Sequence, residues 1–168
     1  MNLCPSKKDK AMFTPTHLHA MIIHFPIALL VVGFLSEIIA FITKKEFYKN
    51  VSVFLLLLGA LGAIAAYLSG DFAGEGIEGG PLELPIEMHE EAAVVTLWLS
   101  IVSALYSVTL YFLKYTRVWT KWVGILLFGA LIASVARTGY LGGQLVYKHG
   151  AGVEIGLPDF NAPANEDE

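Results

Sequence analysis

Charge and cysteine are the two features that this sequence most lacks. Charged residues make up 15% of the 168 residues, whereas an average soluble domain has about 25%. This deficit excludes a disordered chain, a coiled coil and most soluble domains. The single cysteine, Cys4, excludes an intramolecular disulfide and any Cys-x-x-Cys metal or redox pair. The net charge of −4 argues against a nucleic-acid-binding protein, which needs a basic face.

Long apolar runs dominate what the sequence does contain. Hydrophobic residues make up 55% of the chain, and the mean hydropathy is +0.61. The runs cover Leu18 to Ile42, Phe47 to Leu68, Ala92 to Leu113 and Val118 to Val146. Each run provides the roughly 20 helical residues that cross a bilayer, and none alternates in polarity as barrel strands do. We therefore predict an all-α integral membrane protein whose four helices form an antiparallel, up-down-up-down bundle.

The composition also divides the chain into three parts. We expect an N-terminal tail over residues 1–15, a four-helix transmembrane domain over 16–153 and an acidic C-terminal tail over 154–168. The first apolar run is too long and too rich in histidine for a cleaved signal peptide, so we expect it to remain in the mature protein. No internal repeat stands out.

The links between the runs predict the orientation. Two links are basic, and their residues are Lys44, Lys45, Lys49, Lys114, Arg117 and Lys121. The third link is acidic, with Asp71, Glu75, Glu78, Glu83 and Glu87. The positive-inside rule places the basic links in the cytoplasm and both termini on the outer side. Lys7, Lys8 and Lys10 oppose this orientation, but they are fewer than the six basic residues of the links.

All five histidines fall on the predicted outer side: His17, His19, His24, His89 and His149. At a rise of 1.5 Å per residue, His24 lies roughly 10–14 Å below the start of its helix, close to the depth of Arg137. Ionisable residues inside a membrane are costly, so a functional role is the first interpretation of both. His17 and His24 share a helix face, whereas His19 points elsewhere.

Imidazoles from facing helices are the usual axial ligands of a membrane-bound haem b. Our first ligand pair is His24 and His89, although their depths differ, and His19 and His149 are the alternates. The protein would then be a b-type cytochrome-like electron carrier or a redox-complex subunit, rather than a stand-alone enzyme. Its expected partners are the lipid bilayer and quinol, a cytochrome c-like carrier or other redox subunits, with the acidic outer link docking a basic carrier.

The fourth run carries a polar stripe that could bind the haem propionates. The stripe consists of Arg137, Tyr140, Gln144 and Lys148, which share one helix face. Three small residues on the same helix, Gly139, Gly142 and Gly143, would leave room for a flat macrocycle.

Other interpretations remain open. The same imidazoles could hold copper or zinc, or the chain could be a cofactor-free structural or assembly subunit whose polar stripe binds a partner helix. His24 could bond the carbonyl of Ile22, which Pro26 leaves without its usual donor. Arg137 could pair with Asp71 or Glu75. Hydrolase and nucleotide-binding functions have no support, because no HExxH motif or Gly-rich phosphate loop is present.

Three motifs resemble a known family. They are HAMIIHFPIAL from His19 to Leu29, His89-Glu90 at the start of the third run, and GYLGG followed by LVYKHG between Gly139 and Gly150. Together they resemble the bacterial membrane proteins called domain of unknown function 2231, in which a proline usually stands where this chain has Ala20. The resemblance covers about Thr16 to Val153, implies a bacterial inner-membrane location, and makes His19, His24, His89 and His149 the family's histidine set. Some relatives are joined to cytochrome c or Rieske-type domains, which implies a redox setting by analogy.

Overall fold

The computed structural model describes residues 14–74, 80–114 and 117–153. Cys4, the N-terminal lysines and the expected acidic tail over 154–168 lie outside the described residues. The helices are α1 (Pro15–Thr43), α2 (Glu46–Gly74), α3 (Glu83–Leu113) and α4 (Val118–His149). The predicted all-α class is confirmed, and each helix is long and apolar enough to cross a membrane. The helices extend past the apolar runs mainly where α1 and α3 begin and α2 ends.

Local sequence signals explain where the helices begin and end. Thr14 caps α1, because its hydroxyl oxygen accepts a hydrogen bond from the His17 amide at 3.3 Å. Pro15 follows at the start of the helix, where a missing N–H costs little. Lys44 and Lys114 end α1 and α3 in the left-handed conformation, with φ of 57° and 50°. Their amides bond back to carbonyls of the last helical turn, and the chain then reverses.

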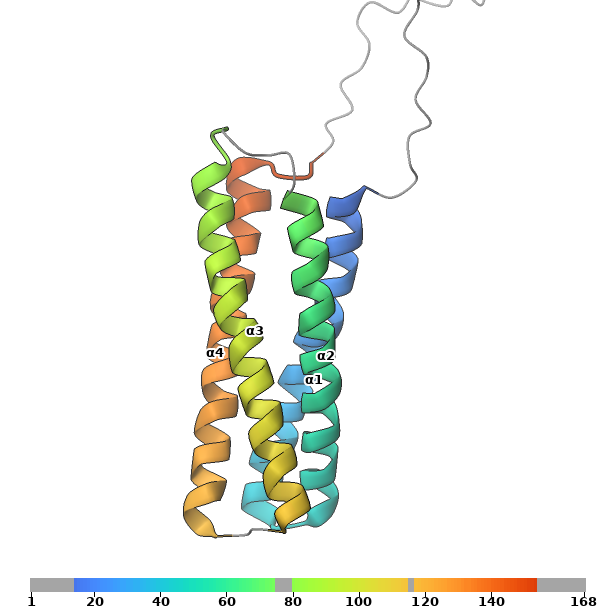
Figure 1. Cartoon of the computed structure of the whole chain (residues 1–168), viewed down its shortest axis with the longest axis vertical. Coiled ribbons are helices and arrows are strands. Elements are labelled where there is room, and N and C mark those ends of the chain that lie inside the picture. The colour runs from blue at the N-terminus through green and yellow to red at the C-terminus, as the bar shows by residue number, and fades with distance from the viewer. Residues whose placement is uncertain (1–13, 75–79, 115–116, 154–168) are drawn as a thin grey trace, which may run out of the picture.

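The helices pack in a closed ring. Each contacts its two neighbours, α1 against α2 and α4, and α3 against α2 and α4. In the part of the chain that the structure describes, α1 and α3 therefore lie across the bundle from each other. Figure 1 shows consecutive helices running in opposite directions, with the start of α1 and the end of α4 at the same end. We call this end the terminal end, and the other, which carries Lys44 and Lys114, the basic end.

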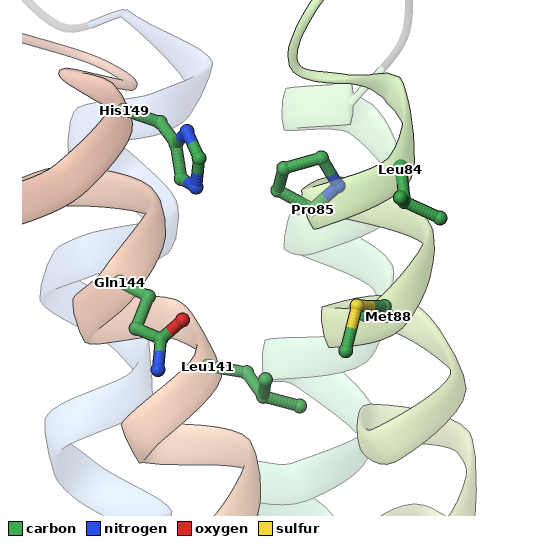
Figure 2. Close-up of a pocket in the computed structure, with 6 residues that line it drawn as sticks. All are labelled: Leu84, Pro85, Met88, Leu141, Gln144 and His149. Atoms are coloured by element: carbon green, nitrogen blue, oxygen red, sulfur yellow. The ribbon is translucent and has the colours of Figure 1, made fainter.

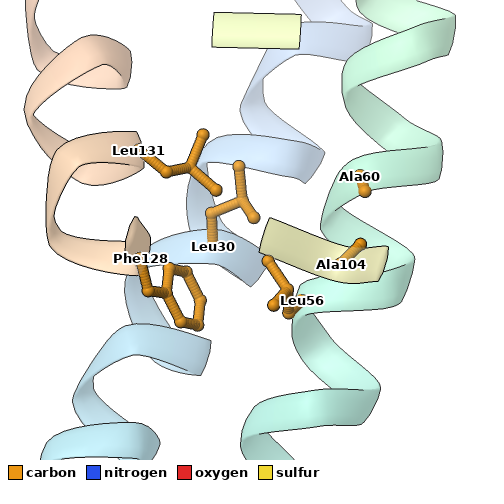
Figure 3. Packing of buried hydrophobic residues seen from close by; sticks show 6 residues of the cluster. All are labelled: Leu30, Leu56, Ala60, Ala104, Phe128 and Leu131. Atoms are coloured by element: carbon orange, nitrogen blue, oxygen red, sulfur yellow. The ribbon is translucent and has the colours of Figure 1, made fainter. Parts of the chain in front are cut away.

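A small apolar core lies in the middle of the bundle (Figure 3). It consists of Leu30, Leu56, Ala60, Ala104, Phe128 and Leu131. Gly59 lets α2 approach α1 closely, because a Cβ there would lie 2.6 Å from Cδ2 of Leu30. Many large apolar side chains face outward instead, such as Phe25 at 73% and Phe112 at 77% exposure. An apolar outer surface of this kind suits contact with lipid chains.

A buried carboxylate joins α1 to α2 near the basic end. Glu37 is 6% exposed, and its two oxygens accept hydrogen bonds from Lys49 Nζ at 2.6 Å and Ser52 Oγ at 2.8 Å. A carboxylate is tolerated in apolar surroundings when it is paired and hydrogen-bonded in this way. The pairing fixes the register of α1 against α2.

The hairpin α1–α2 and the hairpin α3–α4 repeat one another. In the first helix of each hairpin, the residues that recur 70 positions apart are Pro15 and Pro85, His19 and His89, and Lys44 and Lys114. In the second helix, the residues that recur 72 positions apart are Lys49 and Lys121, and Gly70 and Gly142. The link between α3 and α4 is longer than the link between α1 and α2, which accounts for the change of offset. The two hairpins thus share these five positions, a repeat that the sequence analysis missed.

We expect Gly59→Ala to lower the free energy of unfolding by about 1–3 kcal/mol, because the new methyl group would overlap the buried Leu30 side chain. Thermal or denaturant unfolding in detergent micelles measures the change. Gly139→Ala is the matched control, since a Cβ at Gly139 meets nothing within 4 Å. Equal stability of the two variants would contradict the packing described for α1 and α2.

Lys49→Met should destabilise the protein by about 1–2 kcal/mol, because it removes the cation from the buried Glu37 carboxylate, while Lys49 itself is 42% exposed and Ser52 stays bonded. Adding Glu37→Gln to this variant should recover much of the loss, since no buried charge then remains. Unfolding of the two variants and the parent in one detergent tests the pair. If the double variant is no more stable than Lys49→Met, the carboxylate is not charged in the fold.

Candidate functional site: a pair of imidazoles on the bundle axis

His19 faces the inside of the bundle from α1. Its Nδ1 lies 2.9 Å from Ser69 Oγ on α2. The Ser69 hydroxyl donates its own proton to the Ala66 carbonyl at 2.9 Å. With the Ser69 proton on that carbonyl, Ser69 Oγ accepts a hydrogen bond from His19, and the imidazole proton of this tautomer lies on Nδ1. The Nε2 atom of His19 is then the nitrogen with a lone pair.

His89 occupies the corresponding position on α3. Its Nδ1 lies 3.2 Å from the backbone carbonyl of Thr138 on α4. A carbonyl only accepts hydrogen bonds, so the proton of this imidazole is also assigned to Nδ1. Both histidines therefore present an Nε2 lone pair while the neighbouring helix holds Nδ1–H. This arrangement is typical of imidazoles that bind a metal.

The two imidazoles meet across the bundle. Their ring centroids are 6.5 Å apart and their planes are inclined by 82°. Since α1 and α3 are not neighbours in the described part of the ring, the two rings approach each other over its axis, near the terminal end. Both side chains are partly buried. The structure therefore brings together residues that are 70 positions apart in the sequence.

A glycine of the next helix supports each imidazole. A Cβ on Gly70 would lie 3.0 Å from Cε1 and 3.4 Å from Nδ1 of His19. A Cβ on Gly142 would lie 3.1 Å and 3.4 Å from the same atoms of His89. The near-identity of these distances shows that both hairpins pack the imidazole on a glycine in the same way. Gly142, which we expected to leave room for a macrocycle, leaves room for the His89 imidazole. Gly139 and Gly143 have open space beside them.

A cluster of hydroxyls steadies the α4 side of the site. Thr96 Oγ1 on α3 lies 2.7 Å from Ser134 Oγ and 2.9 Å from Thr138 Oγ1 on α4. Thr96 also donates to the Ala92 carbonyl, and Thr138 donates to the Ser134 carbonyl. These bonds fix α3 against α4 one to two turns inward of His89. They hold in place the residue whose carbonyl orients that imidazole.

His24 lies elsewhere on α1. It lies five positions after His19, which places the two side chains about 140° apart around the helix. His24 is exposed, and its Nδ1 bonds the carbonyl of Ala20 at 2.6 Å rather than that of Ile22. His17 is exposed on the same side of the helix. The imidazole beside His89 is therefore that of His19, our alternate ligand, and not that of His24.

The predicted propionate ligands divide into two groups. Arg137, Tyr140 and Lys148 are exposed on α4, and Arg137 forms no ion pair within the described residues. Gln144 instead lines a hollow of about 90 Å³ together with His149 (Figure 2). The polar stripe is present as a helix face, but these four side chains do not converge on the imidazole pair.

Each hairpin has a hollow near the terminal end. The first lies between the start of α3 and the end of α4, and its lining residues are Leu84, Pro85, Met88, Leu141, Gln144 and His149. The second, of about 440 Å³, lies between the start of α1 and the end of α2, and its lining residues are Thr14, Pro15, Leu18, Ser69 and Phe72. The second hollow contains Ser69, which orients His19.

Three supporting residues escaped the sequence analysis: Ser69, Gly70 and Thr138. For Gly70 the available signal was the repeat, because each helix that follows a histidine-bearing helix carries a glycine at the equivalent position. Ser69 and Thr138 do not recur, since their counterparts are Leu141 and Ala66. Composition alone shows only that small residues are common in these helices.

The fold and the site together define a class: a membrane protein with four apolar helices that bring two imidazoles together inside the bundle. The chain belongs to the family described as Predicted membrane protein (DUF2231), whose model matches residues 15–155. This confirms the predicted family and includes all four helices and both histidines of the pair. No curated protein and no solved structure matches the chain.

Gly70→Ala and Gly142→Ala should each displace the imidazole that packs on the glycine, because the added carbon would lie about 3 Å from Cε1. We expect each variant to shift the Cε1–Hε1 NMR signals of both His19 and His89, since the rings are in contact range of each other. Gly143→Ala is the control and should shift neither signal. Variants that move only the nearer histidine would show that the two rings do not meet.

Proposed function

We propose that this protein binds a haem b-type group through His19 and His89 and transfers electrons in the membrane. The observation that carries the proposal is the pair of imidazoles whose ring centroids lie 6.5 Å apart across the bundle, each with Nδ1 held by the neighbouring helix. When bound, such a group supplies a one-electron redox centre. The residues of the chain supply its ligands and their orientation.

The donor set fits a haem group, which His19 and His89 would hold through imidazole nitrogens. The two ring centroids are 6.5 Å apart, so both imidazoles could donate to one group between them. Ser69 and Thr138 fix the tautomers and make Nε2 a better donor, as residues behind metal ligands do. In helix bundles, cofactor sites are built from side chains on facing helices.

Two protein ligands favour haem over a zinc ion. Protein zinc sites use three or four protein ligands. Across residues 14–74, 80–114 and 117–153, no group of three His, Cys, Asp or Glu side chains is placed to hold a metal ion. Haem iron needs only the two axial ligands from the protein.

The orientation follows from the charges at the two ends. We place the basic end in the cytoplasm of a bacterium and the terminal end on the periplasmic side of the inner membrane, by the positive-inside rule. The imidazole pair then lies near the outer surface, within reach of a soluble cytochrome c-like carrier or of other redox-complex subunits.

The absorption spectrum of detergent-purified protein, oxidised and dithionite-reduced, tests the proposal. We expect a Soret band in protein expressed with ample haem. His19→Leu and His89→Leu each remove an imidazole that would hold the haem, so each should change the reduced spectrum and weaken haem retention by about tenfold or more. His24→Leu is the matched control, the same substitution on the same helix, and should leave the spectrum unchanged.

Three results would overturn the assignment. The first is the absence of a Soret band, and the second is an unchanged spectrum when both His19 and His89 are replaced. The third is an equivalent of copper or zinc without iron in elemental analysis of the same preparation. A spectrum that changes with His24→Leu but not with His19→Leu would restore His24 as the ligand.

A further inference from the structure

The larger of the two hollows, between the start of α1 and the end of α2, lies where the chain enters the fold. Its volume of about 440 Å³ is in the range of pockets that hold small organic groups, so a phenyl ring fits in it. Two of its apolar lining residues, Leu18 and Phe72, are 49% and 67% exposed. Thr14, the first residue that the structure describes, also lines the hollow. The segment that precedes α1 therefore starts at the rim of this hollow.

The other hairpin shows which group the α1–α2 hairpin lacks at this place. Helix α3 begins at Glu83, two residues before Pro85, whereas α1 begins at Pro15 itself. Leu84 therefore supplies an apolar side chain to the α3–α4 hollow, where the equivalent residue of α1 is the helix cap Thr14. The α3–α4 hollow has a volume of about 90 Å³. The larger hollow thus occurs in the hairpin without an apolar residue at this position.

The residue directly before the cap is apolar and aromatic. When a helix begins with a capping threonine, an apolar residue before the cap often packs against the fourth residue of the helix, a contact called the hydrophobic staple. In α1 the cap is Thr14, the residue before it is Phe13, and the fourth residue is Leu18. Because Leu18 lines the hollow, a staple between these two residues would direct the Phe13 ring towards it.

Charge favours the same placement. The segment before α1 carries three lysines, Lys7, Lys8 and Lys10. At the end of α2, Asp71 directly precedes Phe72, is exposed and forms no ion pair within the described residues. Lys10 stands three residues before Phe13, and three extended residues span roughly 10 Å. With Phe13 in the hollow, the Lys10 ammonium group would be within reach of the Asp71 carboxylate.

We propose that the segment preceding α1 docks on the α1–α2 hairpin, with Phe13 in the hollow and Lys10 beside Asp71. The docked ring covers Ser69, which lines the hollow and accepts the hydrogen bond of His19 at 2.9 Å. A hydrogen bond is stronger where water is excluded, so the segment stabilises the orientation of His19. The proposal does not depend on the haem assignment.

NMR spectroscopy of the full-length protein in detergent micelles tests the docking. We expect nuclear Overhauser effects from the Phe13 ring protons to the Phe72 ring and to the Leu18 methyl groups. The amides of His17 and Leu18 bond to Thr14 in the first turn of α1. In Phe13→Ala they should exchange with solvent about fivefold faster, because the staple that steadies this turn is lost.

Met12→Ala is the matched control, since it shortens the neighbouring side chain, and it should leave both exchange rates unchanged. Asp71→Asn should weaken the Overhauser effect between Phe13 and Phe72, because the ion pair no longer favours docking. Three results would overturn the proposal: Overhauser effects from Phe13 to detergent chains alone, equal exchange rates in Phe13→Ala and Met12→Ala, or contacts of Phe13 with α3 instead of α2. An undiminished Overhauser effect in Asp71→Asn would overturn the pairing of Lys10 with Asp71.

Discussion

The site depends on one constraint: each imidazole is fixed from behind by the helix that follows it in the chain. A hydrogen bond from Nδ1 to Ser69 or Thr138 sets the tautomer, and a glycine lets the ring pack against the helix backbone. Without the bond, the lone pair and the proton could exchange places between the two ring nitrogens. The geometry of the pair therefore belongs to the hairpins as much as to the histidines.

Helix length and depth could be predicted from the sequence because they depend on the chain alone. The apolar runs located all four helices, and the spacing correctly separated the faces of His19 and His24. The depth of a residue in the membrane does not show which face of α1 points into the bundle. Depth alone favoured His24 as the ligand. The inward face is set by the partners of α1, such as Ser69 for His19 and Ser52 for Glu37 on α2. These contacts join residues on different helices, and the sequence alone does not show which residues meet.

The repeat explains why the two half-sites agree so closely while the middle of the bundle does not. Near the terminal end, both hairpins keep a proline, a histidine and a glycine at equivalent positions. Nearer the basic end, Glu37 on α1 pairs with Lys49, whereas the equivalent position on α3 is Ser107. Lys49 itself recurs as Lys121, so the hairpins differ there in the partner of the lysine and not in the lysine.

The division of the imidazole pair between two hairpins has a thermodynamic consequence. Each hairpin alone supplies one donor, so any group that binds both donors also links the two halves of the bundle. Its binding free energy would then add to the free energy with which one hairpin docks on the other. A higher fraction of bound protein would therefore mean a higher fraction with the two hairpins docked. An empty bundle would open along its two inter-hairpin seams more readily than a filled one.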